Sequence, residues 1–270
     1  SCGNLIILSS GGKLNMQLFD LKGKTALITG ASSGLGEQFA RSLSGAGARV
    51  ILAARRIDKL NILAAELNNA KAIQMDVSDK QSVKSCFAEL EQAGEKIDIC
   101  VNNAGIFKAT PVFEEDHQND FESVMQTNVM GVWYVAKAAA NHMKNHGIHG
   151  SIINISSVNG ANYLQANRVG YCASKAAVIQ MTKALVGELS PNKIRVNCIV
   201  PGPFHTAATD YKVSTPELRK NLEASIPLGF FADPSDLDGL ILYLASNNTS
   251  RYVTGSIITI DGGISWGKPS

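Results

Sequence analysis

The chain has 270 residues, of which 45% are hydrophobic and 18% are charged, and its formal net charge is +2. This composition permits a large buried core and argues against disorder. The lysines and arginines are scattered, and no apolar run approaches the roughly 20 residues of a membrane-spanning helix. We therefore expect neither a nucleic acid nor a membrane as a partner.

The cysteines show no pairing pattern. There are five, none in a CxxC motif, and three lie inside apolar runs. We expect buried, reduced thiols in a cytoplasmic protein, and a disulfide framework is the alternative. The positions are Cys2, Cys86, Cys100, Cys172 and Cys198.

Residues 1–15 look unlike the rest of the chain. Leu5 to Leu8 are apolar, but the run is short and lacks a basic leader, so a secretion signal is not expected. Met16 stands just before the first segment with the pattern of a folded domain. We interpret residues 1–18 as an N-terminal extension or an expression remnant, and residues 19–270 as one domain.

From Lys24 onward, short apolar runs alternate with longer amphipathic stretches. The runs predict strands at residues 25–29, 49–53, 71–75, 97–101, 150–155, 195–200 and 256–260. The stretches predict helices at residues 34–46, 78–93, 115–126, 131–145, 170–190 and 234–245, and one more that follows the second strand and ends at Leu67.

This alternation predicts an α/β fold: a doubly wound, Rossmann-like parallel sheet of about seven strands with helices on both faces, in a single domain. The nearly continuous apolar run Ile152 to Ile155 fits a strand that is buried on both sides. Residues 204–231 break the alternation. They are either an ordered helical insertion or a mobile lid, and we expect a substrate loop there.

The first predicted strand runs into a glycine-rich turn, TGASSGLG, at residues 29–36. Gly30, Gly34 and Gly36 allow a tight turn and close approach of the backbone to a pyrophosphate. The helix that begins near Gly34 then directs its free N–H groups and positive dipole end at the phosphates. The alternative is a purely structural turn between strand and helix.

The second predicted strand ends in Arg55 and Arg56, and no acidic residue occurs from Val50 to Arg56. An Asp or Glu near this point binds the ribose 2′-hydroxyl of NAD, whereas an arginine accommodates the 2′-phosphate of NADP. We therefore favour NADP(H) over NAD(H). The alternative is that the two arginines only solvate the end of the strand.

Tyr171 and Lys175 are four residues apart at the start of a predicted helix, so they share one face. A neighbouring ammonium and a cationic nicotinamide favour the phenolate, which lets a phenol exchange protons with a carbonyl or alcohol oxygen. Ser157 ends the fifth predicted strand, where ligands of parallel sheets bind. Taken alone, a Tyr–Lys pair at this spacing is usually an ordinary pair on a helix surface. A serine at the end of a strand is likewise usually only a turn-forming residue.

Together and in this order, these pieces resemble the short-chain dehydrogenase/reductase family, in its single-domain form of about 250 residues. The sequence NNAG at residues 102–105 matches that family's strand-four motif. Asn128 completes the matching tetrad with Ser157, Tyr171 and Lys175, and Pro201-Gly202 followed by Thr206 matches the loop under the nicotinamide. The likeness extends from Phe19 to Gly263, and its general pattern is similar to that of 3-oxoacyl reductases.

The resemblance implies a role for each member of the tetrad. Tyr171 would be the general acid/base, and Ser157 would orient and polarise the substrate oxygen. Lys175 would hold the nicotinamide ribose hydroxyls and lower the pKa of Tyr171. Asn128 would anchor a water that links Lys175 to solvent. Ser174 is given a packing role.

The resemblance also implies a set of cofactor contacts, among which Asp76 would contact the adenine and Asn103 would line the cleft. The set is Gly30, Ser32, Ser33, Gly34, Leu35, Gly36, Arg55, Arg56, Asp76, Val77, Asn103, Ala104, Gly105, Tyr171, Lys175, Pro201, Gly202, Phe204 and Thr206.

The implied activity is hydride transfer between NADP(H) and a carbonyl or secondary alcohol substrate of small or medium size. The alternative is a relict that binds NADP as a sensor or scaffold without catalysis. The family's usual homotetramer would bury the outer faces of helices 131–145 and 170–190.

Three histidines, His142, His146 and His149, fall at helical spacing and raise the question of a metal. They lie where a helix ends, which also suits histidine electrostatically, so we predict no metal site. His205 is close to the nicotinamide loop, and we expect no catalytic role for it. Cys172 is expected to pack or to line the substrate side.

Overall fold

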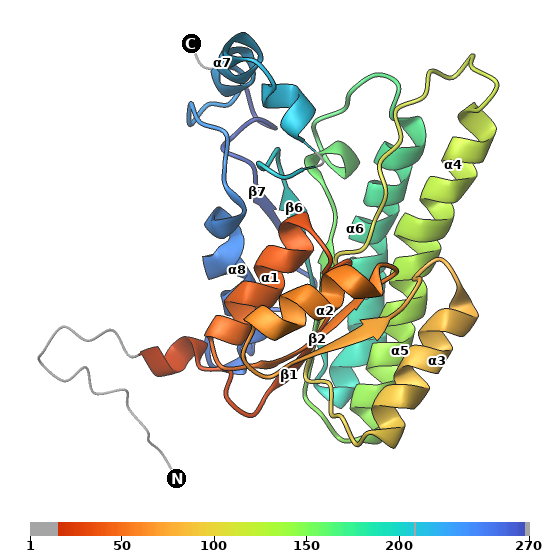
Figure 1. The fold of residues 1–270 in the computed structure, drawn as a ribbon, viewed down its shortest axis with the longest axis vertical. Helices are drawn as coiled ribbons and strands as arrows, with labels where there is room; N and C mark the ends of the chain where they lie inside the picture. Colours follow the sequence, from red (N-terminus) through yellow and green to blue (C-terminus); the bar gives the residue numbers. More distant parts are fainter. Residues whose placement is uncertain (1–15, 208, 268–270) are drawn as a thin grey trace, which may run out of the picture.

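The computed structural model describes residues 16–207 and 209–267, so Cys2 and residues 1–15 of the expected extension lie outside the described part. Figure 1 shows a central sheet between two layers of helices. The last residues of the expected extension contact the domain, because Met16–Phe19 forms a 3-10 helix and the Ser246 hydroxyl donates to the Leu18 carbonyl at 2.8 Å.

All seven strands form one parallel sheet in the order β3-β2-β1-β4-β5-β6-β7, which confirms the predicted doubly wound fold. The strands are β1 (Thr25–Thr29), β2 (Arg49–Ala54), β3 (Ala70–Gln74), β4 (Ile99–Asn102), β5 (Ser151–Ile155), β6 (Arg195–Pro201) and β7 (Ile257–Ile260). Every residue of β1, β4, β5 and β6 is buried, as expected of strands covered on both faces.

Two cores hold the helices to the sheet. On one face, apolar side chains of α1 (Gly34–Gly45), α2 (Ile57–Glu66) and α8 (Asp238–Ala245) pack together. On the other, side chains of α3 (Lys80–Gln92), α5 (Gly131–Asn145) and α6 (Val169–Leu189) do the same. Short helices also form at Val158–Gly160, Ser190–Asn192 and Asn247–Ser250 (α9).

The predicted helices at residues 115–126 and 131–145 form one continuous helical rod. α4 (His117–Met125) runs through a π-helix at Gln126–Met130 directly into α5. The predicted helix at residues 234–245 begins as a 3-10 turn, Pro234–Leu237, before α8. Other element ends differ from the predictions by a residue or two, as helix and strand ends commonly do.

Residues 204–207 and 209–231, which we call the insertion, lie between β6 and the Pro234–Leu237 turn and contain two short helices. The insertion contains a 3-10 helix at Asp210–Val213 and α7 (Pro216–Ala224). Its two ends meet, because Phe204 forms an isolated parallel bridge with Ala232. Figure 1 shows α7 at the top of the molecule, beyond β6 and β7.

No described helix combines the length and the apolar composition needed to cross a membrane.

Candidate active site

A cleft of about 440 Å³ lies at the carboxyl ends of the strands. Its walls come from the β1–α1 turn, the ends of β2, β5 and β6 with the residues that follow them, the residues after β3 and β4, Thr127 and the start of α6. The expected site residues that line it are Gly30, Ser32, Ser33, Gly34, Leu35, Gly105, Arg55, Arg56, Asp76, Val77, Asn103, Ala104, Ser157, Tyr171, Lys175, Pro201, Gly202 and Thr206.

Three expected site residues do not line the cleft. Gly36 lies behind the turn, in α1. Asn128 is fully buried below the cleft floor. Phe204 differs most from the expectation, since its ring is only 4% exposed and packs in the core beside α8. An apolar ring at the base of an insertion gains more from core burial than from an open cleft.

The glycine-rich turn leaves space for a ligand at the start of α1. Gly30 and Gly34 adopt φ values of +67° and +60°, which side chains other than glycine rarely adopt. A Cβ on Gly36 would lie 2.3 Å from the Gly30 carbonyl oxygen, so only glycine lets the helix approach the turn this closely. In the part of the chain that the structure describes, the Ser33 side chain does not cap α1. The first backbone N–H groups of α1 therefore stay available to bind an anion.

The far end of the cleft is basic. Arg56 donates to the hydroxyls of Ser32 at 2.9 Å and Ser33 at 3.2 Å, so its guanidinium is held against the glycine-rich turn. Arg55 lies beside it and also lines the cleft. Asp76 is fixed in a turn, with its carboxylate accepting from the Ser78 N–H at 2.9 Å and the Ser78 hydroxyl at 2.7 Å. A dinucleotide with a 2′-phosphate fits this turn and these arginines.

The first turns of α6 place the proton-transferring candidates at the other end. Lys175 is 5% exposed, and its Nζ donates to the Ile155 carbonyl at 2.9 Å and lies 5.8 Å from the centre of the Tyr171 ring. The Tyr171 ring meets the edge of the Phe107 ring at 5.1 Å between centroids. Ser157 faces Tyr171 closely enough for a side-chain hydrogen bond.

Burial shapes the ionisation of both residues. Desolvation raises the pKa of Tyr171, while the hydrogen bond from Ser157 and then the charge of Arg168 act to lower that pKa. The pKa of Lys175 is lowered to about 8, mainly because its ammonium is desolvated. The contributions that lower the pKa of Tyr171 come from Ser157 and Arg168, and the sequence did not single out Arg168. That Lys175 lowers this pKa stays a prediction.

Asn128 and Ser174 position the catalytic segment. The Asn128 side chain accepts from the Ile106 N–H at 2.8 Å, donates to the Ile106 carbonyl at 2.9 Å, and donates to the Ser174 hydroxyl at 3.1 Å. Ser174 in turn donates to the Tyr171 carbonyl at 2.8 Å. The loop after β4 is thereby tied to the backbone of Tyr171, a larger role for Ser174 than packing.

The cleft also contains residues that the sequence did not single out, such as Ile106, Phe107 and Thr127. Ile106 and Phe107 directly follow the NNAG motif, and Thr127 directly precedes Asn128. These positions could have indicated that the three residues lie at the site.

The histidines at the end of α5 form a cluster with Glu91 of α3. The Glu91 carboxylate lies 3.1 Å from Nδ1 of His142 and 2.9 Å from Nε2 of His146, and His149 is not a member. His142 also accepts from the Ile97 N–H through Nε2 at 3.2 Å, so a neutral ring bears its proton on Nδ1, toward Glu91. Burial lowers the pKa of His142, which favours this neutral form. We assign the cluster to the packing of α3 against α5.

His205 and Cys172 occupy supporting positions. Nε2 of His205 lies 3.4 Å from the Asp210 carboxylate, and its Nδ1 lies 3.8 Å from the Asp233 carboxylate. The centroid of its ring is 5.6 Å from that of the Phe231 ring. All of these residues lie within or beside the insertion. Cys172 is half-buried on α6, next to Tyr171, and is not among the residues that line the cleft.

Comparisons with known proteins agree with this architecture. A family model described as enoyl-(acyl carrier protein) reductase matches residues 30–265. The 3-oxoacyl-(acyl-carrier-protein) reductase of Thermotoga maritima is 36% identical over 249 residues, which cover 90% of this chain and 98% of that protein.

Two solved structures are similar throughout. A short-chain type dehydrogenase/reductase from Mycobacterium marinum has a TM-score of 0.87 and 39% identity, covering 93% of this chain and 99% of that one. A gluconate 5-dehydrogenase from Burkholderia cenocepacia J2315, in complex with NADP and tartrate, has a TM-score of 0.86 and 34% identity at the same coverages. The predicted family and enzyme class are confirmed, and the chain belongs to the short-chain dehydrogenase/reductase family of oxidoreductases.

Proposed function

We propose that this protein transfers a hydride between NADP(H) and a carbonyl or secondary alcohol substrate, with Tyr171 as the general acid/base. One observation supports this most strongly. The same cleft has a phosphate-binding turn with two arginines at one end, and Tyr171, Ser157 and Lys175 at the other. A relict sensor or scaffold would need only the first end.

Each residue of the catalytic end has a defined task in this proposal. The Tyr171 hydroxyl protonates the carbonyl oxygen during reduction, and the raised pKa of Tyr171 keeps that proton in place at neutral pH. The Ser157 hydroxyl donates to the same substrate oxygen and fixes its position. Lys175 uses one N–H for the Ile155 carbonyl and has two left for ribose hydroxyls. The nicotinamide supplies or accepts the hydride when it is bound.

The remaining residues hold this end in place. Asn128 and Ser174 are positioning residues in the proposal, because their side chains hydrogen-bond to each other and to the backbones of Ile106 and Tyr171. We propose a further role for Asn128 as the anchor of a water that connects Lys175 to solvent.

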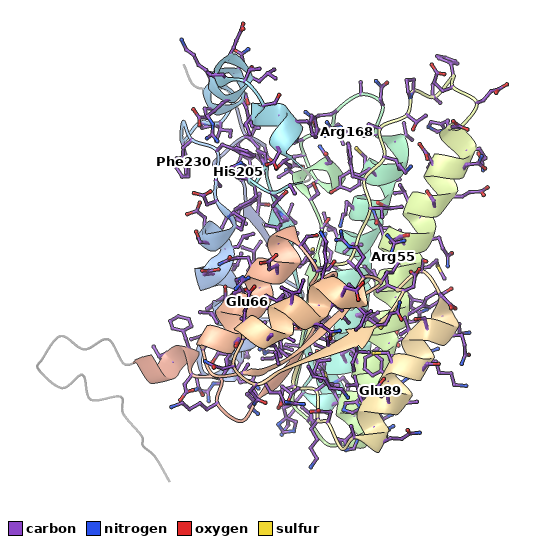
Figure 2. All side chains as sticks on the ribbon, viewed as in Figure 1. Arg55, Glu66, Glu89, Arg168, His205 and Phe230 are labelled. Atoms are coloured by element: carbon purple, nitrogen blue, oxygen red, sulfur yellow. The ribbon has the colours of Figure 1, made fainter. Side chains whose placement is uncertain are left out.

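NADP(H) is preferred in this proposal because two arginines and no acid occupy the end of β2. Figure 2 shows Arg55 well separated from Arg168 and His205, and of these three residues only Arg55 lines the cleft. The Burkholderia relative was solved with NADP.

Replacing Arg55 and Arg56 together by alanine should raise the KM for NADPH by on the order of tenfold or more, because two guanidinium groups no longer meet the 2′-phosphate. The KM for NADH should hardly change. Steady-state rates with each cofactor measure both, and Arg251→Ala, an exposed arginine outside the cleft, is the matched control. The preference for NADP(H) would be refuted if the parent had equal KM values for NADPH and NADH and the double variant left both unchanged.

We further propose that the protein works in the cytoplasm, as a homotetramer. The described cysteines, Cys86, Cys100, Cys172 and Cys198, are free thiols, as in a reducing compartment. In the single chain, α6 exposes Ala173, Ala176 and Ala184 beside the polar side chains of Gln180, Lys183 and Glu188, and a second chain would cover the small apolar ones.

Light scattering at micromolar concentration should give a mass of about four times the 28.7 kDa of one chain. A mass of a single chain would contradict the proposed assembly.

The domain division also remains a proposal. We propose that residues 19–270 are one oxidoreductase domain and that insertion 204–231 contacts the substrate, because it stands at the end of the sheet where the cleft opens.

A further inference from the structure

A series of contacts connects the Phe107 ring to the hydroxyl of Ser157 through two residues that do not line the cleft. Arg168 stacks on Phe107, with 4.9 Å between its guanidinium carbon and the centre of the ring. Nη1 of Arg168 donates to the Asn159 side-chain oxygen at 3.2 Å. The backbone N–H of Asn159 in turn donates to Oγ of Ser157 at 3.2 Å. Arg168 is therefore connected to Ser157 through Asn159 alone.

The guanidinium of Arg168 serves geometry rather than charge neutralisation. Among residues 16–207 and 209–267 it forms no ion pair with a carboxylate. It packs its flat face on the Phe107 ring and donates at its edge to the neutral amide of Asn159. Arginine can do both at once, because its guanidinium is planar and its N–H groups lie in that plane. The Phe107 ring is itself fixed by its edge contact with the Tyr171 ring at 5.1 Å.

Asn159 fixes the short 3-10 helix that directly follows Ser157. The residue is only 5% exposed, and its Nδ2 donates to the Tyr163 carbonyl. A Cβ on Gly160 would lie 2.4 Å from the Lys175 carbonyl carbon, so the same short helix packs directly on α6. Loss of the Asn159 side-chain contacts would let the segment that carries Ser157 shift relative to α6.

The contact from Asn159 also determines where the Ser157 hydroxyl can donate. Because Oγ of Ser157 accepts the Asn159 N–H, the hydroxyl proton has to point to another acceptor. Ser157 lines the cleft and faces Tyr171 closely enough for a side-chain hydrogen bond. A misplacement of about 1 Å in a group that orients a substrate can lower the rate by on the order of 100-fold.

We propose that Arg168 is a positioning residue for the reaction, which through Asn159 holds the Ser157 hydroxyl in the orientation that binds the substrate oxygen. The inference rests on the proposed function, in which Ser157 donates to that oxygen. Neither Arg168 nor Asn159 lines the cleft, so neither contacts the cofactor in this proposal. Loss of Arg168 should therefore lower kcat and leave the KM for NADPH nearly unchanged.

A different route from Arg168 to the reaction is its charge. Desolvation raises the pKa of Tyr171, and the Ser157 hydrogen bond and then the charge of Arg168 act to lower that pKa. Arg168→Lys separates the two routes, because lysine keeps the positive charge but has no planar group that stacks and donates at once. Arg168→Met removes both the charge and the donors and keeps an unbranched side chain.

The test measures kcat and the KM for NADPH in Arg168→Met, Arg168→Lys, Asn159→Asp and Asn159→Leu, each alone and combined with Ser157→Ala. Ethyl acetoacetate, cyclohexanone and pyruvate are first offered to the parent, and the ketone reduced fastest is used throughout. Single-turnover absorbance of NADPH measures the slow enzymes that lack the Ser157 hydroxyl. Arg251→Met, at an exposed position outside the cleft, is the matched control. Urea denaturation reports the stability of each variant.

Arg168→Met and Arg168→Lys should both lower kcat by on the order of tenfold or more and hardly change the KM for NADPH. Asn159→Asp keeps an acceptor for Arg168 and should retain most of the activity, whereas Asn159→Leu should lose as much as Arg168→Met. Combined with Ser157→Ala, Arg168→Lys and Asn159→Leu should lower kcat no further, because the hydroxyl that they position is already absent. Arg251→Met should behave like the parent.

Three outcomes overturn the inference and leave the proposed hydride transfer standing. The first is the parent's kcat in Arg168→Lys, which would assign the effect to charge. The second is an unchanged kcat in both Arg168→Lys and Asn159→Leu. The third is an equal loss with and without the Ser157 hydroxyl, which a general loss of folding would produce. Because Arg168→Lys and Asn159→Asp are mild changes, these comparisons hold even if Arg168→Met does not fold. A parent that reduces none of the three ketones would count against the hydride transfer and this inference together.

Discussion

Tyr171→Phe is expected to lower kcat/KM for carbonyl reduction by on the order of 1000-fold or more, and to leave the affinity for NADPH unchanged. The substitution keeps the ring and its edge contact with Phe107 at 5.1 Å, and it removes the hydroxyl that faces Ser157. In the proposal no other group occupies the position from which Tyr171 protonates the substrate oxygen. Steady-state kinetics and a fluorescence titration of NADPH measure the two quantities separately.

A matched control distinguishes loss of the acid/base from loss of any tyrosine hydroxyl. Tyr252 is 99% exposed and outside the cleft, so Tyr252→Phe should behave like the parent. If Tyr171→Phe reduced carbonyl compounds as fast as the parent, the assigned acid/base would be wrong.

Gly36→Ala is expected to lower the free energy of unfolding by about 3 kcal/mol and to weaken NADPH binding. The new Cβ would lie 2.3 Å from the Gly30 carbonyl oxygen and 2.4 Å from Nδ2 of Asn103. Neither neighbour moves freely, because Asn103 donates to the Thr29 carbonyl at 3.0 Å and Gly30 belongs to the phosphate-binding turn. The start of α1 must therefore shift away from the turn. Urea denaturation and NADPH titration measure the two effects.

The other end of the same helix provides the control. A Cβ on Gly45 would meet nothing within 4 Å, so Gly45→Ala should leave stability unchanged or raise it slightly through better helix propensity. If Gly36→Ala had the same stability and the same NADPH affinity as Gly45→Ala, the close approach of α1 to the glycine-rich turn would not be needed.

The sheet was predictable because its strands are defined by local sequence. Runs such as Ile152 to Ile155 are apolar at every position, and alternation with amphipathic stretches leaves few topologies open. The π-helix at Gln126–Met130 was not predictable in the same way. It surrounds Asn128, whose partners Ile106 and Ser174 lie in other segments. The periodicity of apolar residues does not record such contacts.

In the candidate site, too, features set by local sequence were predictable, and features set by contacts between distant segments were not. Gly30 and residues 32–35, which belong to one contiguous motif, all line the cleft. The direction of the Tyr171 pKa shift depends on desolvation by surrounding segments, and spacing alone could not give it. The stacking of Arg168 on Phe107 and the pairing of Glu91 with two histidines join distant segments. The side chain of Phe204 is buried in the core, and its loop motif does not reveal which side chains turn inward.

The most direct test of the account is to mix the parent enzyme with NADPH and a panel of ketones that includes keto acids, and to follow the absorbance of the reduced nicotinamide. NADPH should be oxidised with at least one ketone, in proportion to the alcohol formed. A parent enzyme that binds NADPH tightly and oxidises it with none of the panel would contradict the account and favour a sensor or scaffold.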